Sequence, residues 1–508
     1  MRLDDLLFDD DLVTGDLDTA LLHLGPRSWT RRNVQQQVEA LRSELASIGV
    51  SAGHAVAVML DNGPDPVAAL FGVWRAGAVY VPLNPRLTGA EVTRILDSVD
   101  PVAVVTSAEH AVRLSDQFAG RSIVITAVDG WSTAAEVDHH EARHHDPAVA
   151  LIQFTSGTTG RPKPVLLLHS GVLTLLDGVL AKLRSGTTSS AAKAGPPRSP
   201  MPNLIPVSLS LWAGIYNVLF ALRVGAPVVI MDGFDPAEFR ALVARFEIRS
   251  TVLPPAAMTM LSDDPTITDL APLRFVRSIT APLSPLQARR FKDRFAIAVL
   301  NSYGQTEIGG EIVGWNAADS RQHGEDKLGS VGRPHAGVTV RVVDDDGHDL
   351  PVGEPGELWV QTPALSAGYA DGADLADRIS VDGWFRTGDY ARVDDGGFVW
   401  IEGRVSSMIN RGGLKVYPGE VEEVIRLHPA VADVAVVAGP DDRLGEVPWA
   451  FVVARQSAPA PAELTELCRA HLAPYKVPVR FEAIDELPRN EVGKVLAREL
   501  IERIGASS

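Results

Sequence analysis

Cysteine is scarce in this chain, since Cys468 is the only one among 508 residues. A single thiol excludes an intramolecular disulfide and any metal cluster held by several cysteines, so a reducing, cytoplasmic location is expected. Basic charge is also in short supply, and the formal net charge is -17 at pH 7. Because nucleic-acid-binding surfaces need basic stripes, no nucleic-acid partner is expected, and any phosphate must be bound locally.

No secretory signal is expected from the first residues. Residues 1–16, MRLDDLLFDDDLVTGD, are acidic where a signal peptide would be basic, and no apolar segment of the signal type follows them. One apolar run, residues 204–222, is long enough to suggest a membrane span. Pro206, Gly214 and Asn217 interrupt it, and it shows no aromatic-belt or positive-inside pattern. The sequence therefore predicts a buried strand and helix here, and no transmembrane segment.

The remaining composition is that of a globular enzyme, with 45% apolar and 22% charged residues. The length exceeds what one core usually supports, so at least two domains are expected. Apolar spacing predicts a surface helix over 34–48, and β-rich runs at 55–60, 102–107, 122–128 and 150–154 predict a largely parallel sheet in an α/β region. Short strands after about 325 predict a small barrel or meander, and a compact α+β unit follows from about 405. The Ser-, Ala- and Pro-rich stretch 184–203 predicts a surface excursion of no assigned function.

The strongest motif is TSGTTGRPK, residues 155–163, directly after a predicted strand. Small residues let backbone N–H groups approach a phosphate, hydroxyls add donors, and Lys163 adds a positive charge. It is not the P-loop motif, because Pro164 follows Lys163 and prevents a helix from starting there. The alternative reading is a flexible linker, which seldom follows a buried strand directly.

Two further motifs carry nucleotide-type chemistry. NSYGQTE, residues 301–307, combines a stacking ring, a tight turn, a hydroxyl and a carboxylate suited to Mg²⁺. WFRTGD, residues 384–389, ends in Asp389, whose carboxylate suits the hydroxyls of a ribose. Taken singly, each motif could be an ordinary surface turn. Two single basic residues, Arg404 in IEGRVSS and Lys494 in PRNEVGKV, could likewise be solvated surface charges.

Taken in order, these motifs resemble the adenylate-forming superfamily of acyl-CoA synthetases, peptide-synthetase adenylation domains and luciferases, from RAGAVYVPLNP (75–85) to GKV (493–495). The resemblance implies an N-terminal domain, 1–404, of two stacked α/β sheets plus a small β-barrel at about 325–403. It also implies a small mobile α+β lid domain, 405–508. Implied cofactors are ATP, Mg²⁺ and coenzyme A.

The resemblance also implies site residues. Tyr303 stacks on adenine, Thr306 contacts the α-phosphate, Glu307 binds the metal, and Lys494 on the lid bridges the reacting carboxylate and the nucleotide. Gly413 lines the thiol tunnel, Thr280 and Gly304 belong to the acyl site, and Asp389, Arg404 and Ala281 belong to the nucleotide site. The phosphate loop contributes Thr155, Ser156, Gly157, Thr158, Thr159, Gly160 and Lys163.

Four positions depart from the family pattern. Pro164 replaces a glycine, Ile279 and Thr280 replace a Gly-Gly pair, and Ser406 stands at the hinge where an acidic or basic residue is usual. Thr280 adds bulk and a hydroxyl near the acyl pocket, while Ser406 leaves the hinge position open.

The substrate is expected to be a hydrophobic carboxylic acid of the fatty, aromatic, terpenoid or sterol type. Residues 206–214, PVSLSLWAG, contain no acidic side chain to pair with an α-amino group, and Leu209, Trp212 and Ile215 offer an apolar lining. Trp212 could equally be an ordinary core residue.

Three hypotheses for the function remain at this point. The first is an acid:CoA ligase, and the second is an acyl-AMP ligase that delivers to a separate acyl carrier protein. The third is a catalytically silent nucleotide-binding or membrane-associated protein, against which the joint presence of Lys163, Glu307, Asp389 and Lys494 argues. The oligomeric state is left open between a monomer and a homodimer.

Overall fold

The largest sheet forms the core of the N-terminal part. The computed structural model describes residues 1–9, 16–127, 130–137, 143–155, 162–185, 200–373, 375–489 and 495–506. The sheet is parallel except at its two edge strands, and the strands predicted at 55–60, 102–107, 122–128 and 150–154 all lie in it. In spatial order it contains β7 (Gly130–Ala135), β6 (Ser122–Ala127), β5 (Ala103–Thr106), β3 (Ala55–Met59), β4 (Val79–Pro82), β8 (Val149–Thr155) and β9 (Lys163–Leu168).

Helices cover this sheet, which explains its continuously apolar strands. Every residue of β3 and β5 is buried, as expected for parallel strands covered on both faces. The helix predicted over 34–48 is α2, which begins after the capping residue Thr30. The helices of this region are α1 (Asp5–Phe8), α2 (Arg31–Ser47), α3 (Pro64–Arg75), α4 (Gly89–Val99), α5 (Ala108–Arg113), α6 (Ser115–Phe118) and α7 (His169–Ser185).

The apolar run 204–222 is buried inside the protein, as predicted. It supplies most of β10 and α8, and eight of the twelve residues of α8 are buried. Among the described residues, no helix has both the length and the apolar character needed to cross a membrane. β10 (Asn203–Ile205) joins β11 (Val228–Ile230), β1 (Ala20–Leu24) and β2 (Arg27–Thr30) in a four-stranded sheet.

A parallel three-stranded sheet follows and leads into the NSYGQTE motif. It contains β12 (Ser250–Leu253), β13 (Phe275–Ser278) and β14 (Ala298–Leu300). The helices α9 (Pro236–Arg245), α10 (Pro255–Asp263) and α11 (Pro285–Phe295) share an apolar core with this sheet, whereas α8 (Trp212–Arg223) packs against β10. A second three-stranded sheet contains β15 (Ser302–Gln305), β16 (Gly310–Gly314) and β17 (Arg333–Pro334), with α12 (Ala317–His323) between the last two.

The predicted barrel or meander is an antiparallel four-stranded meander. It contains β18 (Thr339–Val343), β19 (Gly356–Gln361), β20 (Phe385–Val393) and β21 (Val399–Arg404), each paired with the next. β20 and β21 carry Asp389 and Arg404, respectively.

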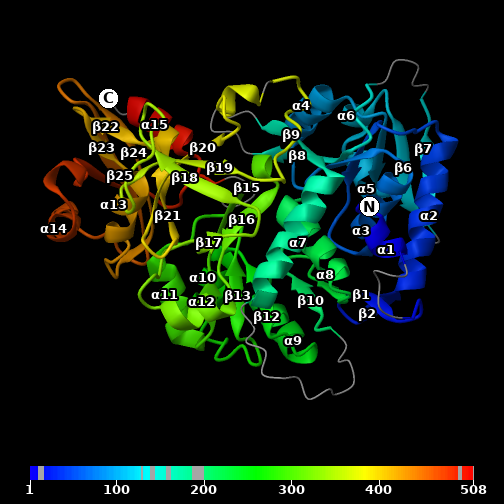
Figure 1. The fold of residues 1–508 in the computed structure, drawn as a ribbon, viewed down its shortest axis with the longest axis horizontal. Coiled ribbons are helices and arrows are strands. Elements are labelled where there is room, and N and C mark those ends of the chain that lie inside the picture. Colours follow the sequence, from blue (N-terminus) through cyan, green and yellow to red (C-terminus); the bar gives the residue numbers. More distant parts are fainter. Residues whose placement is uncertain are drawn as a thin grey trace.

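The C-terminal part has its own five-stranded sheet and cores, formed only by residues 409–504. It lies at one end of the molecule in Figure 1, coloured orange to red. It contains β22 (Ile409–Arg411), β23 (Leu414–Val416), β24 (Val431–Asp441), β25 (Gly445–Ala454), β26 (Arg480–Ala483), α13 (Pro418–Ile425), α14 (Pro461–His471) and α15 (Ala497–Ala506). Ser406 is exposed in the short turn Val405–Ser407 before β22. The domain boundary at 404/405 and the hinge at Ser406 stay predictions.

Candidate active site

Glu307 lies in a tight turn between β15 and β16. A Cβ atom on Gly304 would lie 1.8 Å from the carbonyl oxygen of Gly310, so glycine is needed for the two strands to approach. Glu307 is only 8% exposed. Its Oε1 atom lies 3.3 Å from Nη1 of Arg378 and 3.4 Å from the hydroxyl of Tyr369. The motif thus presents a buried carboxylate held by two polar side chains.

Asp389 is a second buried carboxylate, 2% exposed, on β20 opposite Arg404 of β21. Nε of Arg404 lies 2.6 Å from its carboxylate, and the Tyr303 hydroxyl and Gln305 amide each donate to it over 2.6 Å. Burial raises the pKa of Asp389, and the charge of Arg404 and these hydrogen bonds offset only part of that rise. The second and third motifs therefore meet at Asp389.

The ends of the predicted phosphate loop face the same region. Thr155 and Lys163 pair across β8 and β9, and Lys163 begins a strand and not a helix, consistent with the exclusion of a helix there by Pro164. Nζ of Lys163 lies 5.0 Å from the ring centroid of Tyr369, whose hydroxyl contacts Glu307. The loop residues Ser156, Gly157, Thr158, Thr159 and Gly160 lie outside the described residues, as does Lys494.

The last residue of β13 is hydrogen-bonded to the first residue of β15, which belongs to the NSYGQTE motif. The Ser302 hydroxyl donates to the carbonyl oxygen of Ser278 over 2.9 Å. Thr280 and Ala281 lie two and three residues after Ser278, and Thr280 is exposed with φ of +74°. That conformation favours glycine, which the family pattern has at this position, so Thr280 carries local backbone strain.

The three residues predicted to line the acyl site differ in their surroundings. Nε1 of Trp212 donates to the carbonyl oxygen of Gly309 over 2.9 Å, directly after the turn that carries Glu307. Leu209 and Ile215 are 3% and 2% exposed within the main core. Trp212 therefore contacts the turn of the second motif, whereas Leu209 and Ile215 lie deeper.

Gly413 belongs to the C-terminal part, between β22 and β23. It is exposed with φ of +91°, and its N–H donates to Asn410 over 2.9 Å. Lys415 of the same hairpin lies 3.1 Å from Asp345, and the Tyr417 ring stacks on Tyr390 at 4.4 Å. These contacts hold the hairpin region against β18–β21.

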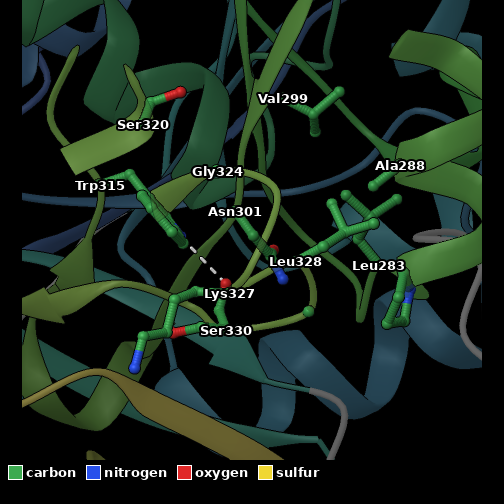
Figure 2. Close-up of a pocket in the computed structure, with 12 residues that line it drawn as sticks. Leu283, Ala288, Val299, Asn301, Trp315, Ser320, Gly324, Lys327, Leu328 and Ser330 are labelled. Atoms are coloured by element: carbon green, nitrogen blue, oxygen red, sulfur yellow. Dashed lines mark hydrogen bonds between the residues drawn. The ribbon is translucent and has the colours of Figure 1, made fainter. Parts of the chain in front are cut away.

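Sequence reasoning missed several residues at the site. The two buried carboxylates are contacted by Gln305, Tyr369 and Arg378. Sequence patterns did not point to these residues, because their partners are far away in the chain or are backbone carbonyls. Asn301 lines a pocket near the start of β15, together with Leu283 and Leu328 (Figure 2). Asn301 and Gln305 belong to the NSYGQTE motif, and that is the one signal by which they could have been found.

A buried ionic network supports the strand that follows Glu307. Glu311 of β16 pairs with Arg277 of β13, and its Oε1 atom lies 3.1 Å from Nε2 of His335. Burial alone would raise the pKa of Glu311, but Arg277 and His335 hold it down to about 2. The network therefore links β13, β16 and the segment after β17.

Comparison with known proteins identifies the family. The model of the AMP-binding enzyme matches residues 13–370, and that of the AMP-binding enzyme C-terminal domain matches residues 420–494. The chain belongs to the AMP-binding enzyme family. This confirms the predicted superfamily and enzyme class, an adenylate-forming ligase.

The relatives of this AMP-binding enzyme extend over nearly its whole length. It is 32% identical to a feruloyl-CoA synthase from Amycolatopsis sp, with 96% of each chain covered. It is 30% identical to the fatty acid–[acyl-carrier-protein] ligase ScoC of Streptomyces coeruleorubidus, covering 95% and 93%. ATP-bound MatB from Rhodopseudomonas palustris matches with a TM-score of 0.86, 25% identity and 99% of each chain covered. These matches confirm the predicted fold class.

Proposed function

We propose that the protein uses ATP and Mg²⁺ to activate a hydrophobic carboxylic acid as an acyl-AMP and then transfers the acyl group to coenzyme A. The observation that carries this proposal is the meeting of three distant motifs, represented by Lys163, Glu307 and Asp389. Tyr369 links Lys163 to Glu307, and Gln305 of the Glu307 turn donates to Asp389. Such an arrangement can bind both ends of one nucleotide.

The two carboxylates suit different parts of ATP. Asp389 would accept hydrogen bonds from the ribose hydroxyls, with Tyr303 beside it near the base. Glu307 offers a hard oxygen ligand of the kind that Mg²⁺ takes alongside phosphate oxygens, so the residues present fit this ion. Magnesium bound there would neutralise charge on the pyrophosphate that leaves.

The first half-reaction needs charge stabilisation more than covalent chemistry. A carboxylate oxygen of the acid attacks the α-phosphorus, and the bond from that phosphorus to pyrophosphate breaks. Lys163, Lys494 and the Thr306 hydroxyl would stabilise the negative charge that builds on the phosphoryl oxygens. Lys494 is carried by the predicted lid, so lid closure would complete the site.

The second half-reaction needs a different lid orientation. A thiolate attacks the acyl carbon and AMP leaves with one oxygen of the original carboxylate. Rotation of the lid would remove Lys494 and bring the hairpin with Gly413 to the site, so that one small domain serves both steps. The exposed position of Gly413 between β22 and β23 is compatible with such a role.

The apolar acid is the finer part of this proposal. Trp212 at the Glu307 turn, with buried Leu209 and Ile215 nearby in sequence, supports a hydrophobic acyl group. Delivery to a separate acyl carrier protein is the alternative, since a relative at 30% identity is named as a ligase of that kind.

The test is pyrophosphate release from ATP with carboxylic acids of graded size and shape, with and without coenzyme A. We expect release that depends on an apolar acid, and acyl-CoA formation when coenzyme A is added. An acyl-AMP that persists in coenzyme A but is consumed by an acyl carrier protein would favour the alternative acceptor. Absence of acid-dependent release across the whole panel would contradict the ligase function.

A further inference from the structure

Arg378 lies in the short turn Ala376–Arg378 before β20, and its side chain is held from several directions. Nε and Nη2 donate to the carbonyl oxygen of Arg386 over 3.1 and 2.9 Å, and Nη2 also donates to that of Thr387 over 2.8 Å. The guanidinium carbon lies 4.4 Å from the ring centroid of Phe385. These contacts fix the plane of the guanidinium and direct its Nη1 atom toward Glu307.

The position of Arg378 is defined by both carboxylates of the site. Nη1 lies 3.3 Å from Oε1 of Glu307. On the other side, Thr387 is two residues before Asp389, and its carbonyl oxygen also accepts from the Gln305 amide over 2.9 Å. A nucleotide with its ribose at Asp389 and its metal-bound phosphates at Glu307 would have to extend past this guanidinium.

The charge of Glu307 explains why a cation is needed at this position. The Glu307 side chain is only 11% exposed, and a buried carboxylate without a counter-charge is strongly unfavourable. Arg378 supplies that charge before a metal binds. Once Mg²⁺ takes the carboxylate, Nη1 is left with a free N–H group, and a guanidinium fork matches phosphate oxygens well.

We propose that Arg378 is a phosphate-binding residue that exchanges Glu307 for oxygens of the triphosphate when Mg²⁺ and ATP bind. This inference rests on the proposed nucleotide site at Glu307 and Asp389. Arg378 is half-buried, with its side chain 26% exposed, so it is accessible to a ligand while its other donors stay on backbone carbonyls.

Three variants test this role. Arg378→Gln removes the charge, and Arg378→Lys keeps a charge but loses the fork. Arg386→Gln is the matched control, since Arg386 is an exposed neighbour on β20 whose side chain lies over Trp359. Binding of ATP with Mg²⁺, ATP in EDTA and adenosine is measured by calorimetry for each protein, and circular dichroism checks the fold.

We expect Arg378→Gln to weaken the binding of ATP with Mg²⁺ about tenfold or more. In EDTA the loss should be smaller, because Arg378 of the wild type then stays paired with Glu307. Adenosine binding should stay unchanged because it has no phosphate. Arg378→Lys should weaken the binding of ATP with Mg²⁺ several-fold and leave adenosine binding unchanged. If the glutamine variant does not fold, the lysine variant decides the question. Arg386→Gln should match wild type.

Two results would overturn the inference. Equal ATP affinity in wild type and both Arg378 variants would show that no phosphate contact exists. An equal loss for ATP and adenosine would assign Arg378 a structural role in β20. Failure of the wild-type protein itself to bind ATP would instead contradict the proposed function, so the two failures are distinguishable.

Discussion

Replacing Glu311 by glutamine should destabilise the protein and loosen the turn that carries Glu307. Glu311 pairs with Arg277, which is 9% exposed, and with His335, which is 4% exposed. Although burial opposes ionisation, these partners lower the pKa of Glu311 from 4.5 to about 2. A tenfold change in an ionisation constant is worth about 1.4 kcal/mol, so the ionised carboxylate contributes on the order of 3 kcal/mol to stability.

The pH dependence has a definite sign. Because the folded-state pKa of Glu311 is lowered, its contribution is fully present above about pH 4.5 and is lost as the pH falls toward 2. In the glutamine variant, Arg277 also stays buried without its counter-charge, which costs about 3 to 5 kcal/mol when one partner of a buried pair is removed. The two free energies, one from the pKa shift and one from the loss of a partner, describe the same interaction and agree in size.

The assay is urea denaturation of wild type, Glu311→Gln and the control Glu325→Gln at pH 7, followed by acid titration. Glu325 pairs with Lys292 on the surface and its side chain is 66% exposed, so its variant should unfold like wild type. The difference in the free energy of unfolding between wild type and Glu311→Gln should become smaller below pH 4.5. A Glu311→Gln curve that overlays the control at pH 7 would refute the reasoning.

Three other substitutions address the site directly. Lys494→Ala should suppress acid-dependent ATP–pyrophosphate exchange by about a hundredfold or more without altering the melting temperature, and undiminished exchange would remove Lys494 from the adenylation step. Asp389→Asn should weaken ATP binding, because the amide leaves Arg404 without its counter-charge and accepts fewer hydrogen bonds than the carboxylate does; unchanged ATP affinity by calorimetry would contradict this. Thr280→Gly should raise the free energy of unfolding by about 1 kcal/mol, since φ is +74° there, and calorimetry showing a loss would exclude backbone strain.

Patterns local in the chain predicted the fold well. The buried runs at 55–60 and 102–107 became β3 and β5 because covered parallel strands are apolar on both faces. Of the interruptions in 204–222, Pro206 lies between β10 and α8, whereas Gly214 and Asn217 are buried within α8. Pro164 correctly excluded a helix after Lys163.

Contacts between distant segments could not be predicted in the same way. Arg378 donates to two backbone carbonyls and to Glu307, which is 71 residues away, and no local pattern encodes such partners. The network of Arg277, Glu311 and His335 depends likewise on the packing of three segments. The left-handed conformation of Thr280 was foreseeable only in part, from the glycine expected at that position.

The central claim is that a carboxylate attacks the α-phosphorus of one ATP molecule bound at Asp389 and Glu307. The most direct measurement uses an accepted acid labelled with oxygen-18 in its carboxylate, with mass analysis of the nucleotide and phosphate products. The account predicts one labelled oxygen in AMP per turnover and none in pyrophosphate. Label in inorganic phosphate, with ADP as the nucleotide product, would contradict it.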